Sequence, residues 1–176
     1  MRTLRSAAGF TLIEMLVVVL IIGVVTAGVM LSVSITGTDH ELQTETERLA
    51  TLMNYARDEA ELQTRELGLA CTPHGYEFLA FDPRTALWGG IDEDEALRAR
   101  KLPAGLTLRL KVEGRDVVFK PPLATDQKKP DVMIFSNGDL SAFELTVERD
   151  GAARSVTLAI DPKGHIAATA AGEKAS

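Results

Sequence analysis

A single carboxylate, Glu14, lies near the start of a long apolar run, where its charge needs a chemical explanation. Between Arg5 and Asp39 it is the only ionisable side chain. A charge within hydrocarbon costs about 2.5 to 3.5 kcal/mol, so a functional partner is expected. If a peptidase cuts between Gly9 and Phe10, the new amine on Phe10 of one chain and Glu14 of a neighbour would neutralise each other. A carboxylate in the first helical turn also meets the positive end of the helix dipole.

The block Gly9-Phe10-Thr11-Leu12-Ile13-Glu14, preceded by a short basic leader, resembles the processing and assembly motif of type IV pilins and type II secretion pseudopilins. The resemblance implies that residues 1–9 are a prepilin leader removed after Gly9 by a prepilin peptidase on the cytoplasmic side. It also implies methylation of the Phe10 amine and a role for Glu14 in docking each subunit into a filament.

The apolar run itself must hold these residues at a membrane. An ordinary secretory signal is an alternative, because Arg2 and Arg5 precede the run and Val25-Thr26-Ala27 is a weak cleavage site. Such signals have uncharged apolar regions of about 7 to 15 residues, whereas this run contains Glu14 and continues to Ile35. We therefore predict a transmembrane and assembly helix over 10–38, with a plain single-span anchor as the simpler alternative. Arg2 and Arg5 place its N-terminus in the cytoplasm by the positive-inside rule.

A second helical pattern predicts an amphipathic helix over 39–66. Apolar and small side chains recur at spacings of three and four residues and define one face of this helix. That face consists of Leu42, Leu49, Leu52, Met53, Ala56, Ala60 and Gln63. No proline interrupts Phe10 to Thr72, but Gly37 leaves open whether the two helical segments are continuous.

Residues 67–169 read as a β-rich head, followed by a small, polar tail at 170–176 that we expect to be disordered. Short runs rich in Val, Leu, Ile and Phe predict strands at 76–81, 106–112, 116–120, 132–135, 143–148, 155–160 and 165–168. Turns are predicted at Glu113-Gly114, Asn137-Gly138, Asp150-Gly151 and Asp161-Pro162-Lys163-Gly164. The fold class is therefore α+β and pilin-like: a long N-terminal helix packed on an antiparallel sheet or β-sandwich.

Several head segments resemble the H-type minor pseudopilin of type II secretion. They are residues 54–60, 75–79, 102–106 and 134–139. The resemblance implies a low-abundance subunit near the tip of the pseudopilus. Its partners would be other minor pseudopilins, the major pseudopilin and the inner-membrane assembly platform.

Composition narrows the function classes. Loss of residues 1–9 removes two of the 19 basic residues and leaves 17 against 25 acidic ones, a net charge of −8. This acidity argues against a nucleic-acid partner, for which Lys128-Lys129 is thin support. Cys71 is the only cysteine, so an internal disulfide is excluded and a small buried side chain is the expected role.

Catalytic and metal-binding patterns are weak. The three histidines, His40, His74 and His165, fall in separate segments, so we predict no zinc site and no cofactor. Whether the acidic loop at 91–95 binds calcium stays open. The loop lacks the spaced Asp/Asn and Gly pattern of an EF-hand, so a solvated loop without a bound ion is the preferred interpretation. Trp88, at the base of this loop, has core packing as its preferred role and a partner contact as the alternative.

These observations predict a structural subunit rather than an enzyme. The expected function is a minor pseudopilin that supports export of folded periplasmic proteins across the outer membrane. The expected location is the inner membrane, single-pass and in contact with lipid, with the head in the periplasm. One alternative is a minor pilin of a type IV pilus, acting in assembly or DNA uptake. The other is a membrane-anchored periplasmic enzyme or binding module.

Overall fold

The computed structural model describes residues 12–119, 127–150, 154–161 and 164–170, with the side chains of 26–39 and 170 outside the description. The chain divides into two compact units, residues 1–40 and 41–176. The predicted leader and the tail at 171–176 lie outside the described residues.

One helix, α1, runs from Leu12 to Gln63, and Gly37 lies within these bounds. From residue 42 onward its apolar face is buried as predicted, with Leu49, Met53 and Ala60 at most 1% exposed. The assignment of Gln63 to this face was wrong, because Gln63 is exposed in the last turn. Thr46 lies on the buried side, where its hydroxyl donates to the Leu42 carbonyl at 2.7 Å and so avoids an unpaired polar group.

The helix ends at Thr64 through a left-handed residue. Thr64 has a φ of 49°, its N–H donates to the Glu61 carbonyl at 3.2 Å, and the Arg65 N–H donates to Ala60 at 3.0 Å. These two bonds form a Schellman motif, which satisfies carbonyls that the helix end leaves open. The predicted helix over 39–66 therefore ends a few residues early.

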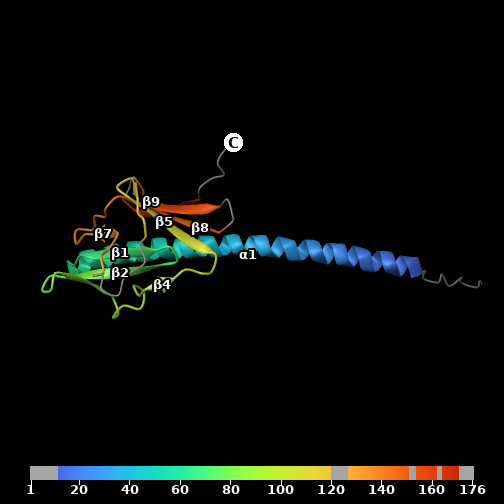
Figure 1. The fold of residues 1–176 in the computed structure, drawn as a ribbon, viewed down its shortest axis with the longest axis horizontal. Coiled ribbons are helices and arrows are strands. Elements are labelled where there is room, and N and C mark those ends of the chain that lie inside the picture. The colour runs from blue at the N-terminus through green and yellow to red at the C-terminus, as the bar shows by residue number, and fades with distance from the viewer. Residues whose placement is uncertain (1–11, 120–126, 151–153, 162–163, 171–176) are drawn as a thin grey trace, which may run out of the picture. The chain divides into compact units, whose positions relative to one another are not determined.

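In the described part of the second unit, ten strands form two antiparallel sheets, and Figure 1 labels several of these strands. The first sheet has the order β3-β2-β1-β7, with β4 also paired to β2. Its strands are β1 (Leu67–Thr72), β2 (Gly75–Asp82), β3 (Leu87–Gly90), β4 (Arg100–Lys101) and β7 (Val132–Ile134). The second sheet has the order β10-β9-β8-β5-β6. It contains β5 (Leu106–Val112), β6 (Arg115–Asp116), β8 (Phe143–Arg149), β9 (Ser155–Ile160) and β10 (Ile166–Ala170).

The strand predictions hold best where apolar and polar residues alternate. β5 and β9 have the predicted bounds, while β2, β7, β8 and β10 differ by one or two residues at an end. The strand predicted at 116–120 was wrong for residues 117–119, and residue 120 lies outside the described residues. The Val117 N–H still donates to the Leu110 carbonyl at 2.8 Å, and Val117 and Phe119 then pack against the core. Strands β1, β3 and β4 were not predicted from the sequence.

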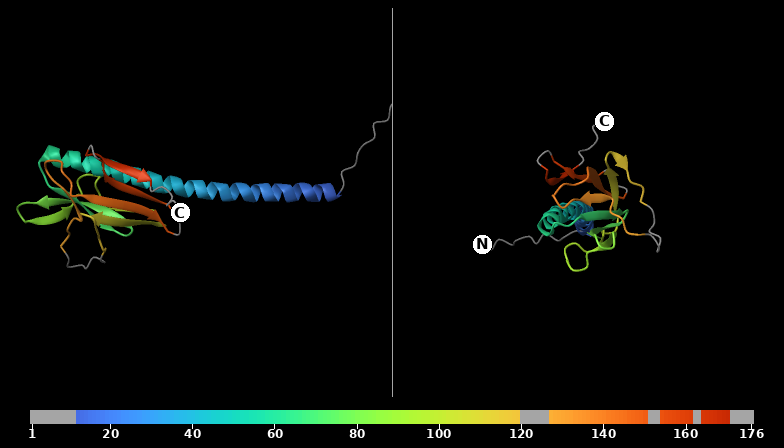
Figure 2. Two further views of the ribbon diagram at one scale, coloured as in Figure 1. Left: turned by 90° about the horizontal axis from the view of Figure 1, so that it is seen from above. Right: turned by 90° about the vertical axis from the view of Figure 1, so that its left-hand side faces the viewer.

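The second unit has one core that joins the helix to both sheets. Buried residues of the core include Leu49 from α1, Phe78 from β2 and Leu145 from β8. Figure 2, in its right-hand view, shows the helical segment of this unit beside the two sheets. The sequence left open a single antiparallel sheet or a β-sandwich; the structure has two sheets that share one core with the helix, which gives the predicted α+β class.

Candidate functional site

Glu14 lies in the first turn of α1, where it is solvent-exposed, and it is the only acidic residue of that turn. The first-turn position puts its carboxylate at the positive end of the helix dipole, as expected from the sequence. Gly9 and Phe10, the other two predicted site residues, lie outside the described residues. The predicted pairing of Glu14 with a neighbouring amine therefore stays a prediction.

Around Glu14 the helix exposes apolar side chains on every side. Leu12 is 84% exposed, Ile13 70% and Val19 68%, and no residue from Leu12 to Val25 is buried. Large contiguous apolar surface of this kind marks a site for another protein or for lipid. The exposed apolar side chains from Leu12 to Val25 therefore give this segment the chemistry of an assembly surface.

Within the described residues, no helix combines the length and the apolar character needed to cross a bilayer. The predicted membrane segment at 10–38 includes residues 10 and 11 and the side chains of 26–38, which lie outside the description.

Polar side chains attach the helix to the second sheet inside the head. Arg149 on β8 forms an ion pair with Glu41 on α1, with Nη2 2.7 Å from Oε2. Arg57 donates to the Gly164 carbonyl just before β10. Asn54 Nδ2 donates to the Ile166 carbonyl at 3.3 Å, while the Ile166 N–H points back to Asn54 Oδ1 at 3.5 Å. These contacts fix the helix surface relative to the strands that would meet a partner.

The acidic loop is held by protein contacts. The Tyr55 hydroxyl donates to Asp94 at 2.8 Å, and the Ala96 N–H donates to the other Asp94 oxygen at 2.8 Å. The hydrogen bond to Asp94 raises the pKa of Tyr55. Among the described residues no cluster of three His, Cys, Asp or Glu side chains has metal-binding geometry. Nothing in the loop geometry favours calcium, and Asp94 acts here as a structural acceptor.

Trp88 and Cys71 both take part in packing. The Trp88 ring is half-buried and packs on Phe81 with ring centroids 5.3 Å apart. Cys71 is buried, and desolvation raises the pKa of its thiol, which keeps the thiol neutral. Its backbone N–H donates to Asp131 Oδ2 at 2.8 Å, and burial raises the pKa of that carboxyl.

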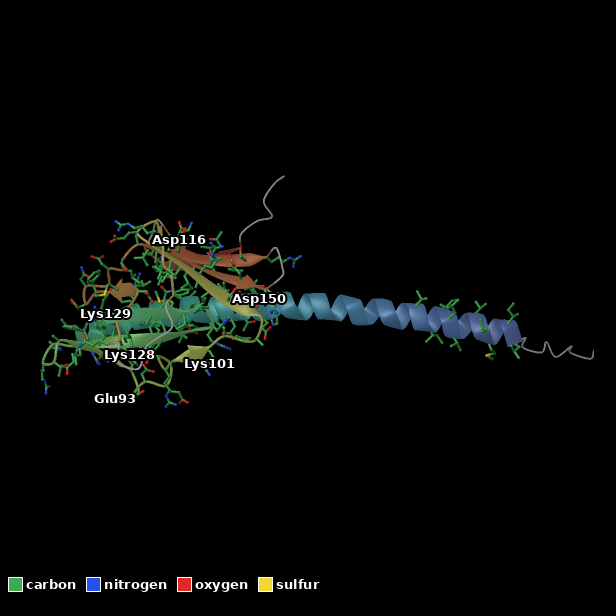
Figure 3. All side chains as sticks on the ribbon, viewed as in Figure 1. Glu93, Lys101, Asp116, Lys128, Lys129 and Asp150 are labelled. Atoms are coloured by element: carbon green, nitrogen blue, oxygen red, sulfur yellow. The ribbon has the colours of Figure 1, made fainter. Side chains whose placement is uncertain are left out.

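One of the two lysines considered as a nucleic-acid contact is already paired with a carboxylate. Lys128 is bound to Glu77 on β2, with Nζ 2.6 Å from Oε1. In Figure 3, Lys128 and Lys101 lie on the same side of the head as Glu93, whereas Asp116 lies on the opposite side. Charges of both signs thus mix on this side of the head. The arrangement lends no support to a phosphate-binding surface for DNA.

Sequence reasoning missed Asn54 and Arg57 as residues that join the helix to a strand edge. Both occur in the segment 54–60 that carries part of the family resemblance, but their partners lie more than 100 residues away. The only sign of these contacts in the sequence is that Asn54 and Arg57 are polar residues next to the apolar face of the predicted helix.

Comparison with known proteins agrees with this division of the chain. Residues 45–164 match the family described as Type II transport protein GspH. Residues 4–30 match the prokaryotic N-terminal methylation motif. The methylation motif thus covers the predicted cleavage site and Glu14, and the family match covers most of the head.

Individual relatives cover nearly the whole chain. The type II secretion system protein H of Pseudomonas aeruginosa is 34% identical over 164 residues, which cover 90% of this chain and 93% of that protein. Its counterpart from Aeromonas hydrophila is 30% identical, with 80% of each chain covered.

Solved structures show the same fold at lower identity. The minor pseudopilin EpsH of Vibrio cholerae superposes with a TM-score of 0.64 at 18% identity, covering 77% of this chain and 98% of that one. The solution structure of GspH from E. coli gives a TM-score of 0.58 at 16% identity, covering 79% and 94%. The pilin-like α+β architecture predicted from the sequence is confirmed by these likenesses. With the family match over 45–164, they establish that this chain belongs to the GspH family of type II transport proteins.

Proposed function

We propose that this chain is a minor pseudopilin, a structural subunit of the type II secretion pseudopilus that supports export of folded periplasmic proteins across the outer membrane. The observation that carries the proposal is the match to type II secretion protein H at 34% identity over 90% of the chain. The exposed apolar segment Leu12 to Val25 supports it, because a subunit of an assembly needs a surface that is covered only by neighbours or lipid.

The family is one of structural subunits, and its methylation motif indicates a membrane-anchored component that assembles with other pseudopilins after processing by a prepilin peptidase. Beyond this, we place the subunit at or near the tip of the pseudopilus. Its direct partners are other minor pseudopilins, the major pseudopilin and the inner-membrane assembly platform. The anchor crosses the inner membrane once, with the N-terminus in the cytoplasm and the head in the periplasm.

Processing follows from the motif at residues 4–30. We propose cleavage between Gly9 and Phe10 and methylation of the new Phe10 amine. Mass spectrometry of the mature chain from a secreting cell tests this step and should find a methylated Phe10 terminus. A terminus near Gly28 would instead identify an ordinary secretory signal.

Glu14 is the proposed docking residue for the Phe10 amine of a neighbouring subunit. Glu14→Ala should leave membrane insertion intact while incorporation into the pseudopilus falls more than a hundredfold. Removing one partner of a desolvated ion pair costs about 3 to 5 kcal/mol, which sets this scale. Crosslinking to sister subunits and secretion of cargo are the measurements.

Met15→Ala is the matched comparison: it removes exposed apolar area from the same surface but no charge, so it should weaken incorporation much less than Glu14→Ala. Glu14→Gln separates charge from size and should behave like the alanine variant. Normal secretion and normal crosslinking in Glu14→Ala would contradict the pairing. Normal secretion in a strain that lacks the whole chain would contradict the proposed function itself.

A further inference from the structure

The open edge of the second sheet is formed by β10, Ile166–Ala170, which pairs only with β9 among the described strands. Its sequence, Ile-Ala-Ala-Thr-Ala, contains no charge and no proline. The opposite edge strand, β6, consists of just two charged residues, Arg115 and Asp116. Proteins usually protect sheet edges with charges, proline or a covering element. β10 lacks the first two, so its backbone is a surface on which another strand can pair.

The register shows which backbone groups of β10 face outward. The Asp161 N–H donates to the His165 carbonyl at 2.8 Å, which makes this pair a bonded rung of the β9–β10 ladder. Bonded rungs alternate along antiparallel strands, so Ala167 and Thr169 direct their N–H and C=O groups to β9. Ile166 and Ala168 therefore direct theirs away from the sheet.

The helix already occupies the first outward position. The Asn54 side-chain amide faces both the N–H and the carbonyl of Ile166, with distances of 3.5 and 3.3 Å. It thus takes the place of one residue of a further strand. Two residues on, no hydrogen bond is recorded for the outward groups of Ala168 within the described part of the chain. The edge is covered at one end and open at the next outward position.

The side chains around Ala168 leave room for an added strand. Ala168 lies on the same face as Ile166, which is 5% exposed, and opposite Leu158 on β9, which is fully buried. Ala168 itself is exposed, as are Ala167 and Thr169. A strand laid along this edge would extend the buried face over Ala168, and the small side chains present no steric barrier to its approach.

We propose that β10 accepts an extended segment of a different pseudopilus subunit as an added strand, centred on the outward N–H and C=O of Ala168. This inference rests on the proposed function and names the contact by which the head joins a neighbour. Strand addition draws its affinity from main-chain hydrogen bonds, and pockets for alternate side chains supply specificity.

The direction of β10 favours a different subunit over a second copy. Gly164 meets Arg57 and Ile166 meets Asn54, so β10 runs antiparallel to α1. Antiparallel pairing of β10 with itself would make the head segments of α1, residues 41–63, run in opposite directions in the two copies. Subunits that follow one another along a pseudopilus share one direction, so antiparallel self-pairing of this edge does not fit the proposed assembly.

The test uses the full-length chain in secreting cells, with a photo-reactive amino acid at Thr169 and Ala168→Pro as the variant. Proline at 168 removes an outward N–H and leaves the bonds to β9 in place, so the melting temperature of the purified full chain should hardly change. We expect the native edge to give an adduct with another pseudopilin and Ala168→Pro to reduce it about tenfold, equivalent to about 1.4 kcal/mol.

Two matched variants control for other effects of the substitution. Ala168→Ser keeps the N–H and should retain the adduct. Ala167→Pro removes a bond to β9 and should lower the melting temperature. An adduct with a second copy of this chain, no adduct with any subunit, or an unchanged yield in Ala168→Pro would overturn the proposal. If secretion requires the chain but Ala168→Pro secretes and crosslinks normally, the edge proposal fails while the proposed function stands.

Discussion

The two units of the chain use the same kinds of side chain in opposite ways. Between Leu12 and Val25, leucine, isoleucine and valine are between 41% and 84% exposed. In the head, residues of the same types such as Leu49, Leu69 and Ile134 are at most 1% exposed. The head therefore buries most of its large apolar side chains in its own core, whereas those from Leu12 to Val25 stay exposed. The burial that stabilises the fold is thus concentrated in the head, while the longest run of exposed apolar side chains lies in the N-terminal unit.

The largest effect on stability is expected from a substitution that leaves a cavity in the core of the head. Phe78 is fully buried and packs edge-on against Tyr76 with ring centroids 6.1 Å apart. Phe78→Ala should lower the free energy of unfolding by about 3 to 5 kcal/mol, measured by urea denaturation of the full chain in detergent. Val17→Ala, at a 44% exposed site, should leave that free energy unchanged. An equal loss in both variants would show that the two units fold as one.

A smaller effect is expected where the head requires a special backbone conformation. Gly138 has a φ of 81°, and an added Cβ would lie 1.7 Å from Glu61 Oε1. Glu61 is an exposed, flexible side chain and can move aside, but the backbone strain remains. Gly138→Ala should therefore destabilise the head by about 1 to 2 kcal/mol.

The same substitution in a Glu61→Ala background separates the two causes. Thermal unfolding of both single variants and the double variant gives the coupling free energy. If Glu61→Ala rescues most of the loss, steric contact and not the backbone conformation is the cause.

Removal of a buried hydroxyl group should stabilise the head, in contrast to the two substitutions above. Tyr76 is 3% exposed, and its hydroxyl has no hydrogen-bond partner among the described residues. Burial raises the pKa of Tyr76 to about 12, so the phenol is neutral at ordinary pH. Tyr76→Phe should stabilise the head by up to about 1 kcal/mol, because the unpaired group is removed. Tyr55→Phe, which loses an exposed bond to Asp94, should be neutral or slightly destabilising in the same unfolding assay.

The smallest expected effect depends on pH. Burial raises the folded-state pKa of Asp131 above the ordinary value of 3.8, so the folded chain holds this proton more tightly than the unfolded chain. Its contribution to stability is greatest below 3.8 and falls as pH rises through the folded pKa.

Asp131→Asn should thus stabilise the head at pH 7 by less than about 1 kcal/mol, since Asp131 is only partly buried and water screens its charge. The advantage over the native chain should shrink on acidification, as followed by melting temperature between pH 3 and 7. A larger advantage at acid pH would contradict the sign.

The regular spacing of apolar residues made much of the head predictable. Leu106, Leu108 and Leu110 alternate with polar residues, and these leucines are the residues that β5 buries. The pattern is informative because successive side chains of a strand point to opposite sides of the sheet. β1 was missed because Gly68 and Ala70 interrupt its apolar run. The reason for Gly68 is tertiary: a Cβ there would lie 2.4 Å from the Cβ of Pro130, which comes just before the neighbouring strand β7.

The residues proposed to act in assembly also differ in whether the sequence could identify them. Glu14 was found from the sequence because a lone carboxylate in an apolar run is costly wherever the chain folds. Asn54 and the edge at Ala168 could not be found in this way. Their pairing joins residues 112 apart in the sequence, and local patterns contain no information about contacts that distant.

The family, the helical segments and the fold class of the head could be predicted from the sequence. The reason is that the spacing of apolar residues and the Gly9-to-Glu14 motif are local properties of the chain. The tertiary structure alone decided how the strands divide into two sheets and which backbone edge remains open. Sheet order depends on pairings between distant segments, and those pairings are selected by the closing of a common core around α1.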